Sequence, residues 1–478
     1  MSRLVNVSNR VPAKGASSPG GLTVGVLSAM RACGGLWFGW NGETVPGEPG
    51  EAETTVRQGI TYTTLPLPQQ LYDRYYSGFA NGTLWPLFHY FLAGFHYEDH
   101  EYAAYREANL TFARRLVEHL RPSDRIWVHD YHLIPLGEEL RTLGVKQRIG
   151  FFLHVPFPNF EVLRALPKFA EIVRALLAYD LVGFQTETDR AGFLDAVRLI
   201  YQAASAGRGI SAPTDPSNVH TGVFPIGVDV KTIAQSAARA TVTGVVQSTV
   251  QSLSGRRLII GADRLDPSKG LLERFRAYQQ FLEDYPEQRG QVTYLQIAPL
   301  GRQSVRAYAQ IRDALEQSSG RTNGRFADAD WTPVRYLNRN YPHATLMGFL
   351  RAAQVCLVTP LRDGMNLVAK EFVAAQNPDD PGMLVLSDMA GAARELTDAL
   401  LVNPYDTKGI ARAIQQALVM PLAERRARHE RLVTALQEND IHRWHERFLE
   451  QLTRESSTSS DCRASPPDSY GAGGPTDG

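Results

Sequence analysis

The chain has 478 residues, of which 43% are hydrophobic and 21% charged, a composition typical of a globular protein with more than one domain. Its 50 Lys and Arg residues balance its 50 Asp and Glu residues, which argues against a general nucleic-acid binder and against a membrane-surface protein. The three cysteines, Cys33, Cys356 and Cys462, form no Cys-x-x-Cys pair, and the first ten residues lack the apolar run of a signal peptide. We therefore expect a soluble, cytoplasmic protein that binds neither nucleic acid nor membranes.

Short apolar runs alternate with stretches of helical periodicity along the chain. The buried-strand candidates are residues 125–129, 148–153, 181–184, 257–260, 292–297, 355–358 and 383–386, and helices are predicted between them, for example over 272–284 and 306–317. This alternation predicts parallel sheets covered on both faces. The fold class is therefore α/β, with two doubly wound domains whose facing cleft holds the active site at the carboxyl ends of the strands.

The domain boundary is predicted near residue 230, where the run Val-Phe-Pro-Ile-Gly-Val-Asp is followed by a less regular segment rich in Ala, Thr, Ser and Gln. We predict a first domain over residues 1–230, a second over 231–440 and a terminal helix over 441–455. Residues 456–478 are rich in Ser, Pro, Gly and Asp and lack apolar periodicity, so this tail is expected to be disordered.

The most informative local motif is Asp-Arg-Leu-Asp-Pro-Ser-Lys-Gly at residues 263–270, between a predicted strand and a predicted helix. Ser268 is expected to cap that helix, and Arg264 and Lys269 add two positive charges to its amino end. This pattern predicts a phosphate site without a Walker A motif. The alternative is an exposed strand–helix loop with surface ion pairs.

A second motif, residues 359–371, also lies between a strand and a helix. Successive amides around Gly364 could form an anion-binding nest. Glu371 would lie two turns from Asp363 on nearly the same face if the helix began at Asp363, and its carboxylate could accept ribose hydroxyls. The alternative is a capped helix whose Glu371 faces solvent.

Further candidates lie in the first half of the chain, after predicted strands. Arg10 follows the first strand, and the Gly20-Gly21 loop could approach a ligand closely. His129 and His132 could suggest a metal, but they lack a carboxylate or cysteine ligand set with fitting spacing. Tyr76 and Trp85 lie in an aromatic segment that would usually form core packing, and His154 also follows a strand.

One motif is interpreted as coincidental. Residues 328–332, Asp-Ala-Asp-Trp-Thr, match the signature of haloacid-dehalogenase-type phosphatases. That chemistry needs the first Asp at the end of a buried strand, and the preceding residues do not form a strand pattern.

Together, these segments resemble the trehalose-6-phosphate synthase family, glycosyltransferase family 20, in order from about residue 1 to residue 450. The shared stretches are Val-Ser-Asn-Arg10, Gly20-Gly21-Leu, Gly-Leu-Trp-Phe-Gly-Trp40, Tyr76 with Leu-Trp85-Pro, His129-Asp130-Tyr-His-Leu, Phe-Leu-His154-Val-Pro-Phe-Pro, Gly-Phe-Gln-Thr186, Arg264-Leu-Asp-x-Ser-Lys269-Gly, Gln296-Ile-Ala-Pro, residues 359–371 and Val-Asn-Pro-Tyr-Asp406. The resemblance implies a GT-B fold whose C-terminal helix crosses back to the first domain. It also implies retaining transfer of glucose from a nucleotide-glucose, UDP-glucose first among them, to glucose 6-phosphate, giving α,α-trehalose 6-phosphate.

The resemblance also implies which residues bind the substrates. For the donor they are Gly20, Gly21, His154, Arg264, Lys269, Tyr341, Asp363, Gly364, Met365, Asn366, Leu367, Val368 and Glu371. For the acceptor they are Arg10, Trp40, Tyr76, Trp85, Asp130 and Arg302, with Arg10 and Arg302 on its phosphate. Asp130, His154, Arg264, Lys269 and Asp363 are expected to be catalytic. We expect no metal, no other cofactor, and a homo-oligomer, either a dimer or a tetramer.

Pro267 departs from the aromatic residue that family members often carry at this position, so the donor nucleotide stays open. The enzymatic alternatives are relatives that make glucosylglycerol phosphate or join cyclitols, which would differ in the acceptor residues. The alternative from another class is a catalytically silent regulator that binds sugar phosphate, which would be expected to lose donor residues.

Overall fold

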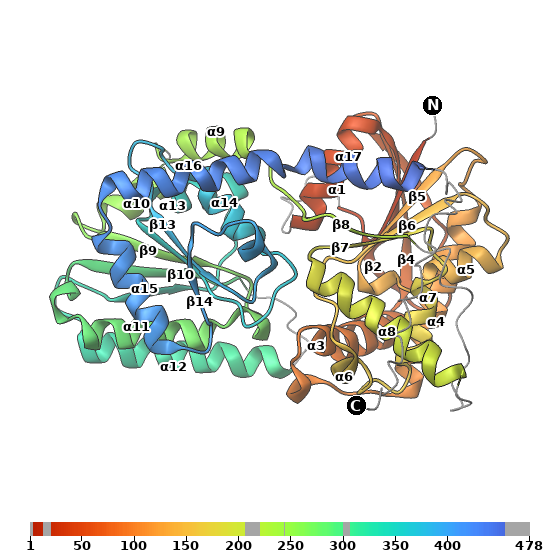
Figure 1. Cartoon of the computed structure of the whole chain (residues 1–478), viewed down its shortest axis with the longest axis horizontal. Helices are drawn as coiled ribbons and strands as arrows, with labels where there is room; N and C mark the ends of the chain where they lie inside the picture. The colour runs from red at the N-terminus through yellow and green to blue at the C-terminus, as the bar shows by residue number, and fades with distance from the viewer. Residues whose placement is uncertain (1–2, 13–20, 206–219, 243, 300–305, 455–478) are drawn as a thin grey trace, which may run out of the picture.

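The computed structural model describes residues 3–12, 21–205, 220–242, 244–299 and 306–454, which form two lobes, each built around one sheet (Figure 1). The predicted disordered tail, residues 456–478, lies outside these ranges. Among the described residues, no helix is long and apolar enough to cross a bilayer. The predicted α/β class with two parallel-sheet domains is confirmed.

The first domain is built on an eight-stranded sheet in the order β3-β4-β2-β1-β5-β6-β7-β8. Its strands are β1 Leu4–Arg10, β2 Gly35–Val45, β3 Glu53–Arg57, β4 Ile60–Pro68, β5 Arg125–His129, β6 Arg148–Phe152, β7 Leu181–Phe184 and β8 His220–Val223. Neighbouring strands are parallel except the edge pair β3 and β4, which is antiparallel. Strands such as β7 are wholly buried because helices cover the sheet, which explains their continuous apolar sequence.

The helices of the first domain include one irregular segment that the sequence did not predict. The α-helices are α1 Gly21–Cys33, α2 Gln69–Tyr72, α3 Trp85–Phe88, α4 Asp99–Val117, α5 Leu136–Thr142, α6 Phe160–Leu163, α7 Phe169–Leu176 and α8 Glu187–Ser205. Between α2 and α3, residues Asp73–Leu84 wind as a π-helix. Such wide turns are rare and are found frequently at functional sites.

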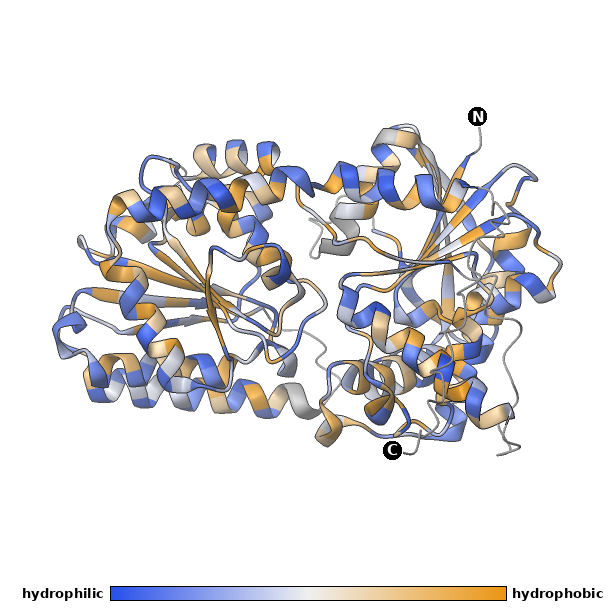
Figure 2. Ribbon diagram, in the orientation of Figure 1, coloured by the Kyte–Doolittle hydropathy of each residue, from blue (hydrophilic) through white to orange (hydrophobic). Residues whose placement is uncertain are grey.

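The second domain contains a six-stranded, all-parallel sheet in the order β11-β10-β9-β12-β13-β14. Its strands are β9 Arg257–Ala262, β10 Val292–Ile297, β11 Val334–Leu337, β12 Val355–Val358, β13 Met383–Ser387 and β14 Leu400–Val402. Its helices are α9 Val230–Ala240, α10 Gly244–Gln251, α11 Leu271–Asp284, α12 Arg306–Phe326, α13 His343–Ala352, α14 Leu367–Ala375, α15 Thr407–Val419, α16 Leu422–Glu438 and α17 Ile441–Thr453, the last of which reaches the first domain. Figure 2 shows the strands as largely hydrophobic ribbons in the interior, with hydrophilic residues along the outer helices.

Both sheets reverse their strand order at one point. In the second domain the reversal lies between β9 and β12, and in the first it lies between β1 and β5. In open α/β sheets the crevice beyond the carboxyl ends at such a point is the usual ligand site. The loops that follow these four strands are therefore where the fold places a ligand.

Two expectations about helices need correction. The segment after residue 230, expected to be less regular, forms α9 and α10, because small residues such as Ala240 allow close packing against Gly348 of α13. The helix expected over residues 306–317 extends to Phe326. Its length confirms that the Asp-Ala-Asp-Trp-Thr motif is coincidental, since Asp328 follows a helix rather than a buried strand.

Within the described residues the chain crosses between the domains twice, and the two crossings touch. Residues 224–229 leave β8 for α9, while Asn439 and Asp440 join α16 to α17, the long helical path along the top of Figure 1. At Gly227 a Cβ atom would collide with the backbone of Asn439 and Asp440, so only glycine allows this contact. α17 then packs against α1, β6 and β7 of the first domain.

A buried lysine joins the first crossing to the second domain. Lys370 of α14 is fully buried, and its Nζ donates to the carbonyl oxygen of Ile226 at 2.8 Å and to Glu395 Oε2 at 2.5 Å. The amide of Ile226 donates to Gln185 of the first domain at 3.0 Å. Burial lowers the pKa of Lys370, an effect that the Glu395 charge opposes. The backbone of one linker residue, Ile226, is thus bonded to both domains.

We predict that Lys370→Met lowers the free energy of unfolding by about 3–5 kcal/mol, because it leaves the Glu395 carboxylate and the Ile226 carbonyl without their buried partner. Urea denaturation measures this change. Adding Glu395→Gln should recover part of the loss by removing the uncompensated charge. Lys408→Met, at an exposed position of α15, is the matched control and should change little. An equally small effect at Lys370 would contradict the bridging role.

Candidate active site between the two sheets

The loop after β9 is shaped by an aspartate rather than by the predicted serine cap. Asp266 Oδ1 accepts from both the amide and the hydroxyl of Ser268 at 3.0 Å, closing a short 3₁₀ turn over Pro267–Lys269. α11 then starts after Gly270, whose φ of +62° suits glycine. The expectation that Ser268 caps α11 is therefore wrong: its side chain is buried and used within the turn.

Lys269 of this loop meets Asp363 from the loop after β12, across the point where the strand order reverses. The distance from Lys269 Nζ to Asp363 Oδ2 is 2.5 Å, and both side chains are largely buried. Burial opposes charge on each group, but the carboxylates of Asp363, Asp263 and Asp266 outweigh it and raise the pKa of Lys269. Lys269 in turn keeps the pKa of Asp363 below its usual value. Both groups are therefore charged, and Arg264 of the same loop is exposed to solvent.

The second loop turns sharply before α14. Asn366 has a φ of +78°, its side chain caps α14 through the amide of Ala369, and its Nδ2 donates to Asp363 Oδ2 at 3.0 Å. Because α14 begins at Leu367, Asp363 lies before the helix, and the two-turn spacing expected between Asp363 and Glu371 does not apply. Leu367 and Val368 are the first two residues of α14, and the amides in the first turn of a helix are suited to binding an anion.

Glu371 has a partner that sequence reasoning missed. His343 Nε2 lies 2.9 Å from Glu371 Oε1, and this hydrogen bond raises the pKa of His343. The Glu371 side chain is only 14% exposed, so the alternative in which it faces solvent is wrong. Tyr341, two residues before His343, packs edge-on against Phe349 with ring centroids 5.3 Å apart. No local sequence signal pairs His343 with a residue on the next helix.

The two domains touch at the loop that carries Asp363. A Cβ atom on Gly364 would collide with the carbonyl oxygen of His154, so glycine at this position lets the backbones of the two domains meet. Arg362 places its guanidinium 3.9 Å from the ring centroid of Tyr90, a cation–π contact across the same boundary. The carboxyl ends of the two sheets are therefore apposed.

The predicted acceptor residues of the first domain form an aromatic group beside Arg10. Trp40, in the middle of β2, lies 4.8 Å from Tyr72 and 6.2 Å from Tyr76, measured between ring centroids. Tyr76, from the π-helix, also stacks on His132. Arg10, exposed at the end of β1, places its guanidinium 5.5 Å from the Trp40 ring. An exposed cation beside aromatic faces can bind an anionic sugar.

Trp85 packs in the core of the first domain, and the charged pair acts on the histidine on which it stacks. It is 95% buried and stacks on His89 at 4.2 Å, while His89 Nδ1 lies 2.8 Å from the Trp85 carbonyl oxygen. The charges of Asp266, Asp363 and Lys269 all act on His89. Trp85 is packed in the core, as expected. The His89 ring on which it stacks is close enough to the second domain to feel the charges of Asp266, Asp363 and Lys269.

Asp130 and His154 lie together at the ends of β5 and β6. Asp130 has a φ of +75° and a ψ of 164°, a conformation that costs a non-glycine residue about 1–3 kcal/mol and is found mostly at functional sites. Its Oδ1 accepts from the amide of His154 at 3.2 Å. This hydrogen bond joins Asp130, which is expected to bind the acceptor, to His154, which is expected to bind the donor.

Two predicted residues, Gly20 and Arg302, lie outside the described residues. Gly21 is the first residue of α1, so the expected Gly-Gly loop is already a helix start at this position. Met365 is buried beside these loops. Among the described residues, no group of three His, Cys, Asp or Glu side chains could hold a metal ion.

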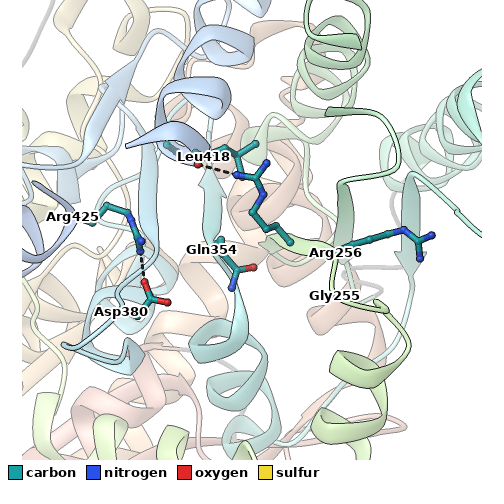
Figure 3. A pocket seen from close by; sticks show the side chains of 8 residues that line it. Gly255, Arg256, Gln354, Asp380, Leu418 and Arg425 are labelled. Atoms are coloured by element: carbon teal, nitrogen blue, oxygen red, sulfur yellow. Dashed lines mark hydrogen bonds and ion pairs between the residues drawn. The ribbon is translucent and has the colours of Figure 1, made fainter. Parts of the chain in front are cut away.

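A separate polar cavity of about 390 Å³ lies at the opposite end of the second sheet (Figure 3). It is lined in part by Arg256, Arg257 and Gln354, at the amino ends of β9 and β12, and by Arg425 of α16. Arg257 donates to the Leu418 carbonyl at 2.9 Å, and Arg425 pairs with Asp380 at 2.7 Å. The cavity is not part of the site between the sheets.

The site holds three histidines, His89 and His129 buried and His154 partly buried, whose pKa values are lowered by loss of solvation: His89 to about 4, His154 to about 3, and His129 well below its usual value. Unfolded, each would have a pKa near 6.5. The unfolded chain therefore binds more protons below that pH, so these groups cost no stability above pH 6.5 and reduce it as the pH falls.

We predict that the free energy of unfolding falls between about pH 6.5 and pH 5 by up to about 1.4 kcal/mol per pH unit for each buried histidine. Urea denaturation at several pH values measures the slope. His89→Gln should reduce it by the share of one histidine, whereas His100→Gln, at an exposed position, should not change it. An unchanged slope in His89→Gln would mean that His89 is charged in the folded protein.

Comparison with known proteins agrees with this geometry. The family model described as glycosyltransferase family 20 matches residues 3–454. A trehalose-6-phosphate synthase from Klebsiella pneumoniae is 46% identical over 465 residues, covering 97% of this chain and 98% of that protein.

Two solved structures are similar over nearly the whole chain. A UDP-forming α,α-trehalose-phosphate synthase from Burkholderia xenovorans, in complex with glucose-6-phosphate, has a TM-score of 0.90 and 46% identity, covering 95% of this chain and 100% of that one. An E. coli protein bound with UDP-2-fluoro glucose has a TM-score of 0.88 and 45% identity, covering 94% and 99%. The resemblance found in the sequence motifs is thus confirmed, and the chain belongs to glycosyltransferase family 20.

Proposed function

We propose that this glycosyltransferase moves glucose from UDP-glucose to glucose 6-phosphate and forms α,α-trehalose 6-phosphate with retention at the anomeric carbon. The observation that carries the proposal is the apposition of two different half-sites. The charged loops of Lys269 and Asp363 suit a diphosphate, and the aromatic group beside Arg10 suits a sugar phosphate. Similar proteins bound with glucose-6-phosphate and with UDP-2-fluoro glucose support the same pair of substrates.

The proposed chemistry is a front-side displacement. The bond from the anomeric carbon to the diphosphate oxygen breaks, the acceptor hydroxyl oxygen bonds to the same face, and its proton passes to a phosphate oxygen of the leaving diphosphate. Lys269, Arg264 and the amides at the start of α14 stabilise the negative charge that develops there. Asp363 is already engaged by Lys269 and Asn366, so we assign it to orienting these groups rather than to nucleophilic attack.

On the acceptor side, we assign Arg10 and Arg302 to the phosphate, and Trp40, Tyr76, Trp85 and Asp130 to the sugar. Glu371 takes the ribose through the carboxylate oxygen that His343 leaves available. We place the reaction in the cytoplasm, in keeping with the unpaired cysteines Cys33 and Cys356.

The direct test is a panel of nucleotide-glucose donors against glucose 6-phosphate, glycerol 3-phosphate and cyclitol phosphates, with the product anomer determined by NMR. The proposal expects UDP release and an α,α-linked disaccharide phosphate. Transfer only to glycerol phosphate or a cyclitol would favour the related synthases. Binding of sugar phosphate without release of nucleoside diphosphate from any donor would favour a silent regulator.

We predict that Lys269→Ala mainly lowers kcat, by roughly 10²–10³-fold, because its charge faces a diphosphate that becomes more negative as the bond breaks. Steady-state kinetics with varied donor separates kcat from KM. Arg325→Ala, which removes a surface ion pair with Glu283 in the same domain, is the control and should leave both unchanged. A rise in donor KM with kcat intact would show that Lys269 acts only in ground-state binding.

We also predict that Arg10→Ala lowers kcat/KM for glucose 6-phosphate by roughly ten- to more than a hundredfold, the value of one charge-assisted contact. Transfer to unphosphorylated glucose, measured in parallel, should change little because it has no phosphate contact to lose. The control is Arg57→Ala, since Arg57 also stacks on an aromatic ring, that of Tyr62, but at the edge of the sheet. If both acceptors lose activity equally, Arg10 serves the fold instead of the phosphate.

A further inference from the structure

A line of hydrogen bonds runs from His154 into the core of the first domain. His154 Nε2 lies 3.2 Å from His129 Nδ1, and His129 Nε2 lies 3.0 Å from Asn6 Oδ1. The amide nitrogen of Asn6 in turn contacts the sulfur of Met30 in α1. Asn6 and His129 are fully buried, in adjacent parallel strands β1 and β5.

The chemistry of these atoms gives the line a direction. A thioether sulfur can only accept, so Asn6 directs its NH₂ group to Met30 and its carbonyl oxygen to His129. His129 must then carry its proton on Nε2 and accept on Nδ1. His154 therefore donates from Nε2, and in a neutral ring its Nδ1 is left as an acceptor.

The surroundings keep both rings uncharged. Trp127 and Trp444 flank His129, and Phe152 and Trp444 flank His154, with ring centroids 4.6 to 6.4 Å apart. Burial lowers the pKa of both histidines, and the proximity of His154 lowers that of His129 further. Two neutral imidazoles joined by one hydrogen bond have two possible arrangements, and the orientation of Asn6 selects one of them.

We propose that Asn6 and His129 are positioning residues that hold His154 in the Nε2–H tautomer, so that Nδ1 of His154 accepts a hydrogen bond from a hydroxyl group of the donor sugar. This inference rests on the proposed function only for the identity of the sugar. With Asn6 turned the other way, His154 would present an N–H group instead. A residue 123 positions before His129 in sequence thus sets which kind of sugar substituent the site accepts.

The first test is ¹⁵N NMR of the full chain labelled at histidine, with His154 assigned through His154→Gln. The expected result is a protonated Nε2 and an unprotonated Nδ1 on His154 at neutral pH. Asn6→Asp keeps an acceptor oxygen and should keep this tautomer, whereas Asn6→Leu and His129→Phe should give a mixture. His429→Phe removes a buried histidine remote from the site, one that bonds to the Val373 carbonyl, and should leave His154 unchanged.

Nδ1–H in the wild-type protein would overturn the proposal, and this measurement needs only the His154→Gln variant for assignment, not a variant of Asn6 or His129. An unchanged His154 signal in folded His129→Phe would overturn it as well. Both readouts are independent of catalysis, so an absence of transfer with every donor would refute the proposed function and leave the tautomer result standing.

The second test uses donors in which each glucose hydroxyl is replaced in turn by fluorine, which cannot donate a hydrogen bond. In the wild-type enzyme one of these replacements should lower kcat/KM by up to about tenfold more than it does in His129→Phe. Comparing the two enzymes on the same donor cancels the intrinsic effect of fluorine on reactivity. Equal losses in both enzymes for every fluorinated donor would show that His154 does not accept from the sugar through this arrangement.

Discussion

The contact between the carboxyl ends of two parallel sheets is the constraint on which the site depends. Each sheet supplies loops at the point where its strand order reverses, and neither set of loops is a complete site alone. Lys370 and Gln185 bond to the two backbone groups of one linker residue, Ile226, and the linker meets the second connection backbone to backbone at Gly227. A single hydrophobic cluster then continues through both domains, including Phe224, Phe349 and Trp444, so the relative position of the sheets is set by packing as well as by hydrogen bonds.

The two half-sites differ in their electrostatics. On the second domain, Lys269 and Asp363 are charged and paired, so any anion that binds there must compete with a carboxylate for the ammonium group. In the proposed reaction, this competition would weaken ground-state binding of the diphosphate more than it weakens the interaction with a diphosphate that has gained charge, which is the condition for an effect on turnover. On the first domain the corresponding positions are aromatic rings and neutral histidines, with Arg10 as an exposed cation at the strand end.

Polar groups in the first half-site connect the backbone geometry at Asp130 to the core of the domain. Asp130, held at a strained backbone conformation, accepts from the His154 amide, while the His154 ring is bonded through His129 to Asn6. Burial lowers the pKa of both histidine rings, so they can orient hydroxyl groups without adding charge to the site.

The sequence alone determined the class of fold, most strands and the location of the two chemical loops. Strands such as β5, β7, β10 and β12 coincide with predicted apolar runs, because burial on both faces leaves a local signature of four to six residues. The order of motifs also identified the family. Only the tertiary structure decided which side chains act together: Asp266 rather than Ser268 organises the first loop, α14 starts at Leu367, and His343 bonds to Glu371. The π-helix that carries Tyr76 and the link from Asn6 to His154 were likewise absent from local patterns. The physical reason is that hydrophobic periodicity is carried by neighbours along the chain, whereas a hydrogen-bond partner is chosen by the packing of strands and domains that are far apart in sequence.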